Sequence, residues 1–319
     1  MRAIPLPTSL CNASLTFSSI SFSAIMLCCC VKDLNKTLQT LFMVEKTIEP
    51  KVEAHNPFAA GVRREIFTRT GAVRMKTGIP GLDAVLNGGL PEKHVVLVTG
   101  GPGCGKTIFG LQFAALGARD YGDRSLFVSF EQTREELIEQ SLQFNWGMEE
   151  LEEKGLLKIL GFAGTSLHVA RIWEAIEKEI SLHKPARLVL DSLASLTVHL
   201  DLMTGMEVLE LIGIDSKEAG FMPTGDAITR RTLLELFKRL KSFRLTSLVI
   251  TEMPENGVGL SRDGVSEFLA DGVIILKYDP EKEESFSKLQ VRKMRGIMHK
   301  RGEFPTMLKE EEGISILLQ

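Results

Sequence analysis

Residues 95–113 read VVLVTGGPGCGKTIFGLQF. The run Val95–Val98 is short, β-branched and without polar alternation, which is typical of a strand buried on both faces of a parallel sheet. After Gly105 apolar residues return at helical spacing, at Ile108, Phe109, Leu111, Phe113 and Leu116. The glycines therefore lie on a turn between a strand and a helix, and the stretch predicts an α/β fold.

The turn satisfies the pattern G-x-x-x-x-G-K-[ST], in which backbone N–H groups curl around phosphate oxygens at the positive end of a helix. Lys106 is expected to reach the β and γ phosphates, and the hydroxyl of Thr107 to ligate Mg²⁺. A chance match is the alternative, but the strand before and the helix after are the context that supports the motif. The predicted nucleotide-binding residues are Gly100, Gly101, Pro102, Gly103, Cys104, Gly105, Lys106, Thr107 and Ile108.

The composition fits one large α/β core with a tail. The chain has 319 residues, of which 44% are hydrophobic. Its net charge of -3 argues against binding nucleic acid through overall charge, although local basic patches remain open. Four of the five cysteines precede residue 31, so the core is not a disulfide scaffold.

The first forty residues differ from the rest. Residues 3–31 carry no charged side chain, and ISFSAIMLCCCV at 20–31 resembles the apolar middle of a signal peptide or a weak membrane anchor. Because Met43 opens an ordinary polar sequence, we expect a poorly ordered extension at 1–42 that need not be native, with an anchor and a removed signal as alternatives. A linker at 43–75 and a nucleotide-binding domain at 76–319 then follow. A cytoplasmic location without stable membrane association is expected.

Two further strands are predicted to end in carboxylates at the edge that holds the phosphate loop. RLVLDSLASL at 187–196 is a buried-strand run reaching Asp191, a Walker B pattern whose carboxylate would hold Mg²⁺ together with Thr107. SLFVSF at 125–130 leads to Glu131, the candidate general base for an attacking water. The alternatives are an ordinary strand-end cap for Asp191, and for Glu131 part of an acidic helix start with Glu135 and Glu136.

Six segments occur in the order found in one known family. They resemble the KaiC-like branch of the RecA-type ATPases over residues 75–306, and they are KTGIPGLDAVLNGGLP at 76–91, GGPGCGKT at 100–107, FVSFEQ at 127–132, LVLDSL at 188–193, EFLADGVIIL at 267–276 and KMRGIMH at 293–299. The resemblance implies a RecA-like three-layer α/β fold with a central, mostly parallel sheet and a C-terminal β-hairpin region. It also implies ATP and Mg²⁺ bound at subunit interfaces, and assembly commonly as a homo-hexameric ring.

The resemblance gives a role to two cations. In the family, the Lys and Arg of K-M-R reach the γ phosphate held by the neighbouring subunit, which corresponds to Lys293 and Arg295 here. Residues 288–302 contain six Lys or Arg and no acid, and alternate residues of a strand share one face, so both side chains would project together. A solvated basic hairpin and a strand that contacts nucleic acid are the alternatives.

Two departures from the family pattern bear on chemistry. Glu131 is followed by Gln132, whereas adjacent carboxylates are usual, so slow turnover or altered coupling is expected. The clock-protein member phosphorylates itself on a Ser-Thr pair where this chain has Glu267 and Phe268, which makes autokinase activity at that place unexpected. Ser261 and Ser266 nearby remain open as alternatives.

The segment 199–226 is longer than a sheet-to-helix connection needs, so it is a candidate site for a protein partner, with packing on the domain as the favoured alternative. The leading hypothesis is a homo-oligomeric ATPase. A DNA-dependent recombinase or helicase relative and a nucleotide-sensing scaffold with negligible hydrolysis are the competing hypotheses.

Overall fold

A computed structural model of the chain describes residues 73–163, 169–196, 225–254, 259–278 and 286–318. The predicted extension at 1–42 lies outside these residues, as do residues 43–72 of the predicted linker and residues 199–224 of the candidate partner segment. The expectations for these segments stay predictions. Within the described part of the chain, no helix is both long enough and apolar enough to span a membrane.

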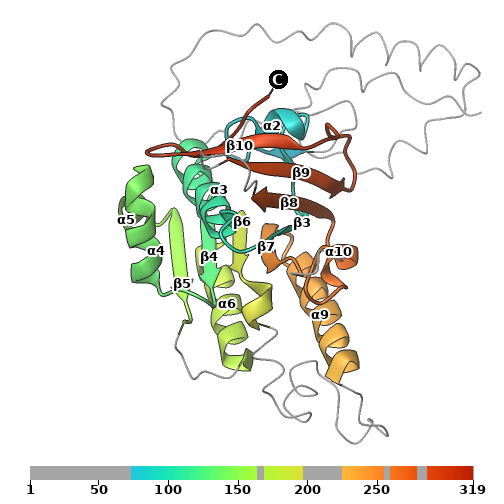
Figure 1. Ribbon diagram of the computed structural model, residues 1–319. Helices are drawn as coiled ribbons and strands as arrows, with labels where there is room; N and C mark the ends of the chain where they lie inside the picture. The colour runs from blue at the N-terminus through green and yellow to red at the C-terminus, as the bar shows by residue number, and fades with distance from the viewer. Residues whose placement is uncertain (1–72, 164–168, 197–224, 255–258, 279–285, 319) are drawn as a thin grey trace, which may run out of the picture. The chain divides into compact units, whose positions relative to one another are not determined.

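One nine-stranded sheet organises the domain, in the order β11-β10-β9-β8-β3-β7-β6-β4-β5 (Figure 1). The six strands from β8 to β5 run parallel, and β9, β10 and β11 continue the sheet in antiparallel fashion. A separate two-stranded sheet pairs β1 with β2. The strands are β1 (Arg74–Met75), β2 (Leu90–Pro91), β3 (Val95–Gly100), β4 (Ser125–Ser129), β5 (Leu157–Gly161), β6 (Arg187–Asp191), β7 (Thr246–Glu252), β8 (Gly272–Tyr278), β9 (Phe286–Met294), β10 (Phe304–Lys309) and β11 (Gly313–Ile316).

Helices cover both faces of the sheet and give three layers. One apolar cluster joins the sheet to α2, α3, α4 and α5, and a second joins it to α6 and α9. The helices are α2 (Leu82–Val85), α3 (Lys106–Tyr121), α4 (Arg134–Ser141), η1 (Leu142–Phe144), α5 (Met148–Glu153), α6 (Val169–His183), α9 (Gly225–Ser242) and α10 (Ser266–Leu269). The predicted three-layer RecA-like fold with a mostly parallel sheet and a C-terminal hairpin region is confirmed.

Strand β3 lies inside the sheet, between β7 and β8. Val96 and Val98 belong to the apolar cluster on one face, and Val95 and Leu97 belong to the cluster on the other. Both sets of side chains are therefore buried, which explains why the sequence of this strand does not alternate with polar residues.

The C-terminal hairpin packs on the helix that follows the phosphate loop. The Gln112 side chain of α3 is fully buried; its Oε1 accepts from the backbone N–H of Ile314 at 2.7 Å, and its Nε2 donates to the Ile314 carbonyl at 3.0 Å. This amide pairs with both backbone groups of Ile314 in β11, so two residues 202 positions apart in the sequence are held together.

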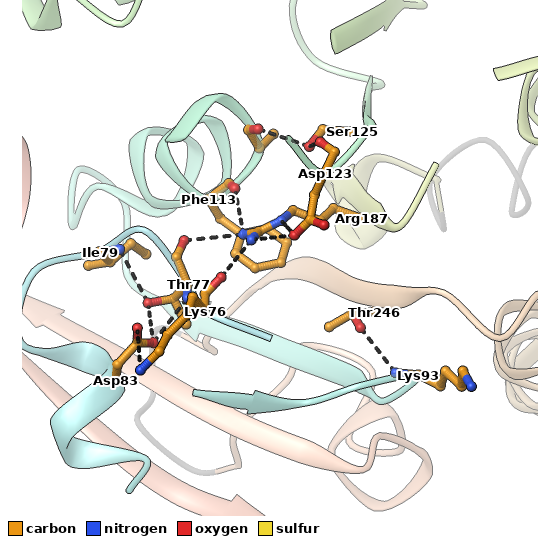
Figure 2. A network of polar contacts seen from close by, with 11 residues as sticks. Lys76, Thr77, Ile79, Asp83, Lys93, Phe113, Asp123, Ser125, Arg187 and Thr246 are labelled. Atoms are coloured by element: carbon orange, nitrogen blue, oxygen red, sulfur yellow. Dashed lines mark hydrogen bonds and ion pairs between the residues drawn. The ribbon is translucent and has the colours of Figure 1, made fainter. Parts of the chain in front are cut away.

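A buried arginine joins the beginning of β6 to two distant segments (Figure 2). The guanidinium of Arg187 is fully buried and pairs with Asp123 at 2.8 Å. It also donates to the carbonyls of Lys76, Thr77 and Phe113 at 2.6, 3.3 and 3.1 Å. Burial lowers the pKa of Arg187, and the Asp123 carboxylate opposes that shift. The start of β6 is thereby tied to the segment before α2 and to α3.

The substitution Gly117→Ala tests how tightly this arginine is packed. An alanine Cβ at position 117 would collide with the Arg187 guanidinium. Helix propensity favours alanine by about 1 kcal/mol, whereas overpacking a rigid core costs about 1–3 kcal/mol. We expect a net loss in the free energy of unfolding, measured by chemical denaturation. In an Arg187→Met background the loss should disappear, and an equal loss in both backgrounds would contradict the steric cause.

Candidate active site

The phosphate loop begins where β3 ends and leads directly into α3. Gly103 and Gly105 have φ values of 72° and 86°, the left-handed region that glycine adopts without strain. Gly105 is the N-cap residue of the 16-residue helix α3, so the free N–H groups of its first turn face the loop. A Cβ added to Gly101 or Gly103 would meet nothing within 4 Å, which leaves the loop backbone open to a ligand.

Gly100 and Cys104 form the packed underside of the loop. A Cβ on Gly100 would lie 2.5 Å from the Cys104 sulfur and closer still to the Leu276 carbonyl. The Cys104 side chain is buried, and burial raises the pKa of its thiol. Cys104 therefore fills space beneath the loop and does not line the pocket above it.

The ammonium of Lys106 is folded back on the loop. Its Nζ donates to the carbonyls of Gly100 and Gly101 at 3.1 and 2.8 Å. These are weak, neutral acceptors for a full positive charge, and phosphate oxygens are better ones. Lys106 is thus held beside the position that a phosphate would take.

Asp191 ends β6 and is almost fully buried. Burial raises its pKa to about 6; a hydrogen bond from the Thr107 side chain opposes the shift and the nearby Glu131 adds to it. Its Oδ2 has no hydrogen-bond partner among the described residues. A buried, unpaired carboxylate oxygen beside a threonine hydroxyl is a donor set that suits Mg²⁺, so Asp191 and Thr107 fit the predicted metal site.

Glu131 follows β4 and is held by two serines from the segment that follows the neighbouring strand β6. Ser192 and Ser195 both donate their hydroxyls to Oε1 of Glu131, the latter at 2.8 Å. Ser129 fixes the turn beneath, since its hydroxyl accepts the N–H groups of Glu131 and Gln132. Both serine contacts fall on Oε1, so neither of them occupies Oε2 of this residue, which lines the pocket.

These groups surround one pocket of about 290 Å³. Of the predicted residues, it is lined by Pro102, Gly103, Gly105, Lys106, Thr107, Ile108, Glu131 and Asp191. Three lining residues were not predicted from the sequence, namely Gln140, Ser192 and Glu252. Glu252 carried a usable signal, because it ends the buried run SLVITE just as Asp191 ends its own strand. Gln140 carried none, and its buried Oε1 has no partner among the described residues.

Lys293 and Arg295 lie at the other edge of the sheet. The backbone of Asp271 bonds to Val95 at the start of β3, and Arg295 pairs with the Asp271 carboxylate at 3.1 Å. The phosphate loop begins five residues further along β3, about 16 Å away at about 3.3 Å per residue. The two cations therefore do not join the pocket of their own chain.

The two cations do lie together, as predicted from their spacing. Lys293 Nζ donates to the carbonyls of Glu267, Phe268 and Ala270 at 3.0, 3.4 and 2.7 Å. Arg295 also donates to the Phe268 carbonyl, at 3.4 Å, and its side chain is half exposed. Burial and then the charge of Arg295 lower the pKa of Lys293.

The serines considered for self-phosphorylation are buried. Ser261 donates its hydroxyl to the Glu267 carboxylate, and Ser266 donates to Asp263 Oδ2 at 2.8 Å. Neither side chain is exposed. The absence of autokinase activity at the place of Glu267 and Phe268 stays a prediction, and the burial of Ser261 and Ser266 argues against these two serines as alternative sites.

The raised pKa of Asp191 predicts a pH-dependent stability. Its usual value is 3.8 and its folded value about 6, so above pH 6 its ionised form costs the folded state about 3 kcal/mol. Without nucleotide, Asp191→Asn is expected to raise the free energy of unfolding at pH 7.5 by about 2–3 kcal/mol. The gain should shrink as pH falls through 6, because folded Asp191 then takes up a proton. Denaturant titrations check this, with exposed Asp120→Asn as the control; a gain independent of pH would contradict it.

Comparison with known proteins gives one consistent result. A family model described as the KaiC ATPase matches residues 75–221 and 209–319. The circadian clock oscillator protein KaiC of Parathermosynechococcus lividus is 29% identical over 280 residues, which cover 85% of this chain and 46% of that protein. KaiC of Synechococcus elongatus is 30% identical over 251 residues, with 76% and 44% covered. The chain thus spans about half the length of the curated relatives it matches.

A solved structure agrees with the sequence matches. The crystal structure of a KaiC-like protein from the hyperthermophilic archaeon Pyrococcus horikoshii superposes with a TM-score of 0.63 at 30% identity, covering 77% of this chain and all of that one. Because the family model spans most of the described domain, the chain belongs to the KaiC family of ATPases.

Proposed function

We propose that this protein hydrolyses ATP in a Mg²⁺-dependent reaction at the pocket above the phosphate loop. The observation that carries the proposal is the convergence of Lys106, the buried Asp191 and the tethered Glu131 on one pocket of about 290 Å³. Three different strands deliver these groups to the same edge of the sheet. Such an arrangement can bind a triphosphate, hold a divalent cation and activate water.

Each side chain has a defined task in this mechanism. Lys106 would leave the loop carbonyls for the β and γ phosphate oxygens. Asp191 and Thr107 would hold Mg²⁺, which would supply charge neutralisation. Glu131 Oε2 accepts a proton from a water in line with the γ phosphorus. The oxygen–phosphorus bond to water forms as the β–γ bridging bond breaks, and ADP leaves.

We further propose that Lys293 and Arg295 complete the pocket of a second copy. The proposal is supported by their position at the edge opposite their own phosphate loop, where Arg295 is half exposed and Lys293 is partly buried. Cations delivered to the γ phosphate stabilise the charge of the transition state. This shared site makes the active form a homo-oligomer, with the hexameric ring of the family as the proposed assembly and the cytoplasm as its location.

Gln132 bears on the rate of the reaction. It follows the proposed base, and the Ser129 hydroxyl accepts its backbone N–H at 2.9 Å. Its neutral side chain adds no second carboxylate beside Glu131, so the serines orient the base alone. We propose slow turnover on this ground, with orientation of Glu131 as the limiting property.

Removing the serine tethers should lower turnover without weakening nucleotide binding. In Ser192→Ala/Ser195→Ala, Glu131 loses both donors to Oε1, and misorientation of a base costs about 10-fold to 100-fold in kcat. Phosphate release gives kcat, and a fluorescent ATP analogue gives the dissociation constant. Ser242→Ala, remote and exposed on α9, is the matched control. An unchanged kcat would contradict a role of the two serines in orienting Glu131.

The shared site predicts that activity depends on assembly. Phosphate release by the full chain should rise more steeply than in proportion to protein concentration. Arg295→Ala should lower it by about 100-fold or more, since one lost transition-state donor costs that much. Arg292→Ala removes an exposed cation of β9, three residues before Arg295, and should have little effect. No phosphate release at any concentration would overturn the hydrolase, and release by a monomer would overturn the shared site.

A further inference from the structure

One carboxylate of the pocket has no task in the proposed reaction. The described residues that line the pocket include three carboxylates, from Glu131, Asp191 and Glu252, and one ammonium, from Lys106. Glu131 is the proposed base and Asp191 the proposed metal ligand, which leaves Glu252 unassigned. A triphosphate brings several further negative charges, so this carboxylate opposes its binding unless a cation accompanies it.

Glu252 lies at the end of the pocket where the γ phosphate is expected. It is the last residue of β7 and pairs with Gly100 of β3 in the sheet. The Gly100 carbonyl accepts the Lys106 ammonium at 3.1 Å and the backbone N–H of Met253 at 3.1 Å. Glu252 is therefore adjacent to the residue that shares this carbonyl with Lys106, the group proposed to meet the β and γ phosphates.

An arginine accompanies this carboxylate. Arg262 Nη1 lies 3.8 Å from Glu252 Oε2, and the two side chains are 66% and 40% exposed. The Arg262 backbone N–H donates to the Glu252 carbonyl at 3.0 Å, so the main chain of the arginine is fixed beside the end of β7. Within the part of the chain that the structure describes, the Arg262 side chain makes no hydrogen bond. Its guanidinium is therefore close to the pocket and has donors to spare.

The backbone on both sides of Arg262 is held in place. On one side the Thr99 hydroxyl of β3 donates to the Leu260 carbonyl at 2.5 Å. On the other side Asp263 Oδ1 accepts the backbone N–H of Ser266, the first residue of α10, at 2.7 Å. The guanidinium can thus change its partner by rotation about side-chain bonds, without a change in the main chain.

We infer that Arg262 is a nucleotide-binding residue, which Glu252 holds while the pocket is empty and which moves onto the γ phosphate when ATP binds. The exposed ion pair is weak, so it releases the guanidinium readily. A phosphate is a stronger partner, because its oxygens accept two parallel N–H bonds from one guanidinium. The inference rests on the proposed binding of a triphosphate at this pocket, but on neither hydrolysis nor the shared site.

This exchange of partners distinguishes ATP from ADP within one chain. ADP has no γ phosphate, so with ADP the arginine stays on Glu252. Because Glu252 and the γ phosphate compete for one guanidinium, Glu252 lowers the affinity for ATP and leaves the affinity for ADP nearly unchanged. After the γ phosphate leaves, Glu252 takes the arginine back, which favours the release of phosphate.

The test compares the affinities for ADP and for a slowly hydrolysed ATP analogue, both with Mg²⁺. The full-chain variants are Arg262→Ala, Glu252→Gln and the two combined, and each nucleotide displaces a fluorescent ADP analogue to give its dissociation constant. Arg119→Ala and Asp120→Asn are the matched controls, because they remove the same kinds of charge from an exposed pair near the far end of α3. Melting curves and sedimentation velocity compare the folding and assembly of each variant with the wild type.

Arg262→Ala should bind the ATP analogue about 10-fold more weakly and ADP within about 2-fold of the wild type, because the lost charge-assisted contact exists only with the triphosphate. Glu252→Gln should bind the ATP analogue about 5-fold more tightly, since the competing carboxylate is gone. In the Arg262→Ala background the same change should gain less than about 2-fold, because no arginine remains to be released. Both controls should match the wild type.

Other outcomes overturn the inference. Equal losses for ADP and the ATP analogue in Arg262→Ala would assign the arginine to the shape of the pocket, and lost assembly would assign it to a contact between subunits. An undiminished gain from Glu252→Gln without Arg262 would show that the carboxylate only repels phosphate. Weaker analogue binding by Glu252→Gln that added Mg²⁺ restores would place Glu252 in the metal site. A wild type that shows the expected affinities but releases no phosphate would contradict the proposed hydrolysis alone.

Discussion

The buried guanidinium of Arg187 is the interaction on which the arrangement of this domain depends. Removing a guanidinium from water costs desolvation free energy, and attraction to a single carboxylate rarely offsets that cost. Here Asp123 supplies the opposite charge, and three backbone carbonyls accept the remaining donors. Any shift of β6 along its neighbours would leave those donors unpaired. The strand is therefore fixed in register by an electrostatic requirement as well as by its apolar side chains.

Strand β6 carries a second buried charge at its other end. Asp191 lies four residues after Arg187, and both are shielded from water. The two differ in their hydrogen bonds, because the Arg187 guanidinium is bonded to a carboxylate and three carbonyls, whereas Asp191 Oδ2 has no partner among the described residues. One end of the strand is thus anchored by hydrogen bonds, and the other end carries a buried carboxylate oxygen without a described partner. A fold can tolerate a buried, unpaired carboxylate when a bound ligand provides the partner that the protein lacks.

Sequence patterns predicted the parts of this protein that are encoded locally. The run Val95–Val98 and the glycines after it predicted a strand, a loop and a helix. Similar apolar runs that lead to Asp191 and Glu131 predicted that these carboxylates lie at one edge of the sheet. The tethers from Ser192 and Ser195 to Glu131 were not predictable, because they join positions more than 60 residues apart that follow two different strands. The position of Arg295 opposite the phosphate loop required the strand order, since β9 runs antiparallel to β8. Local pattern identified the chemistry, and only topology showed which groups share a pocket.

The order of strands in the sheet also has a consequence for biosynthesis. Strand β3 is translated first among the nine but is flanked by β7 and β8, and helix α3 behind it is closed by Ile314 of β11. During translation the phosphate loop emerges more than 200 residues before its last neighbour. A nascent chain would hold that loop without the strands that support it, a state in which exposed apolar edges invite association with other chains. The helix behind the phosphate loop can therefore pair its buried Gln112 side chain only after Ile314 has emerged, so the support of the loop depends on one of the last strands of the sheet to be synthesised.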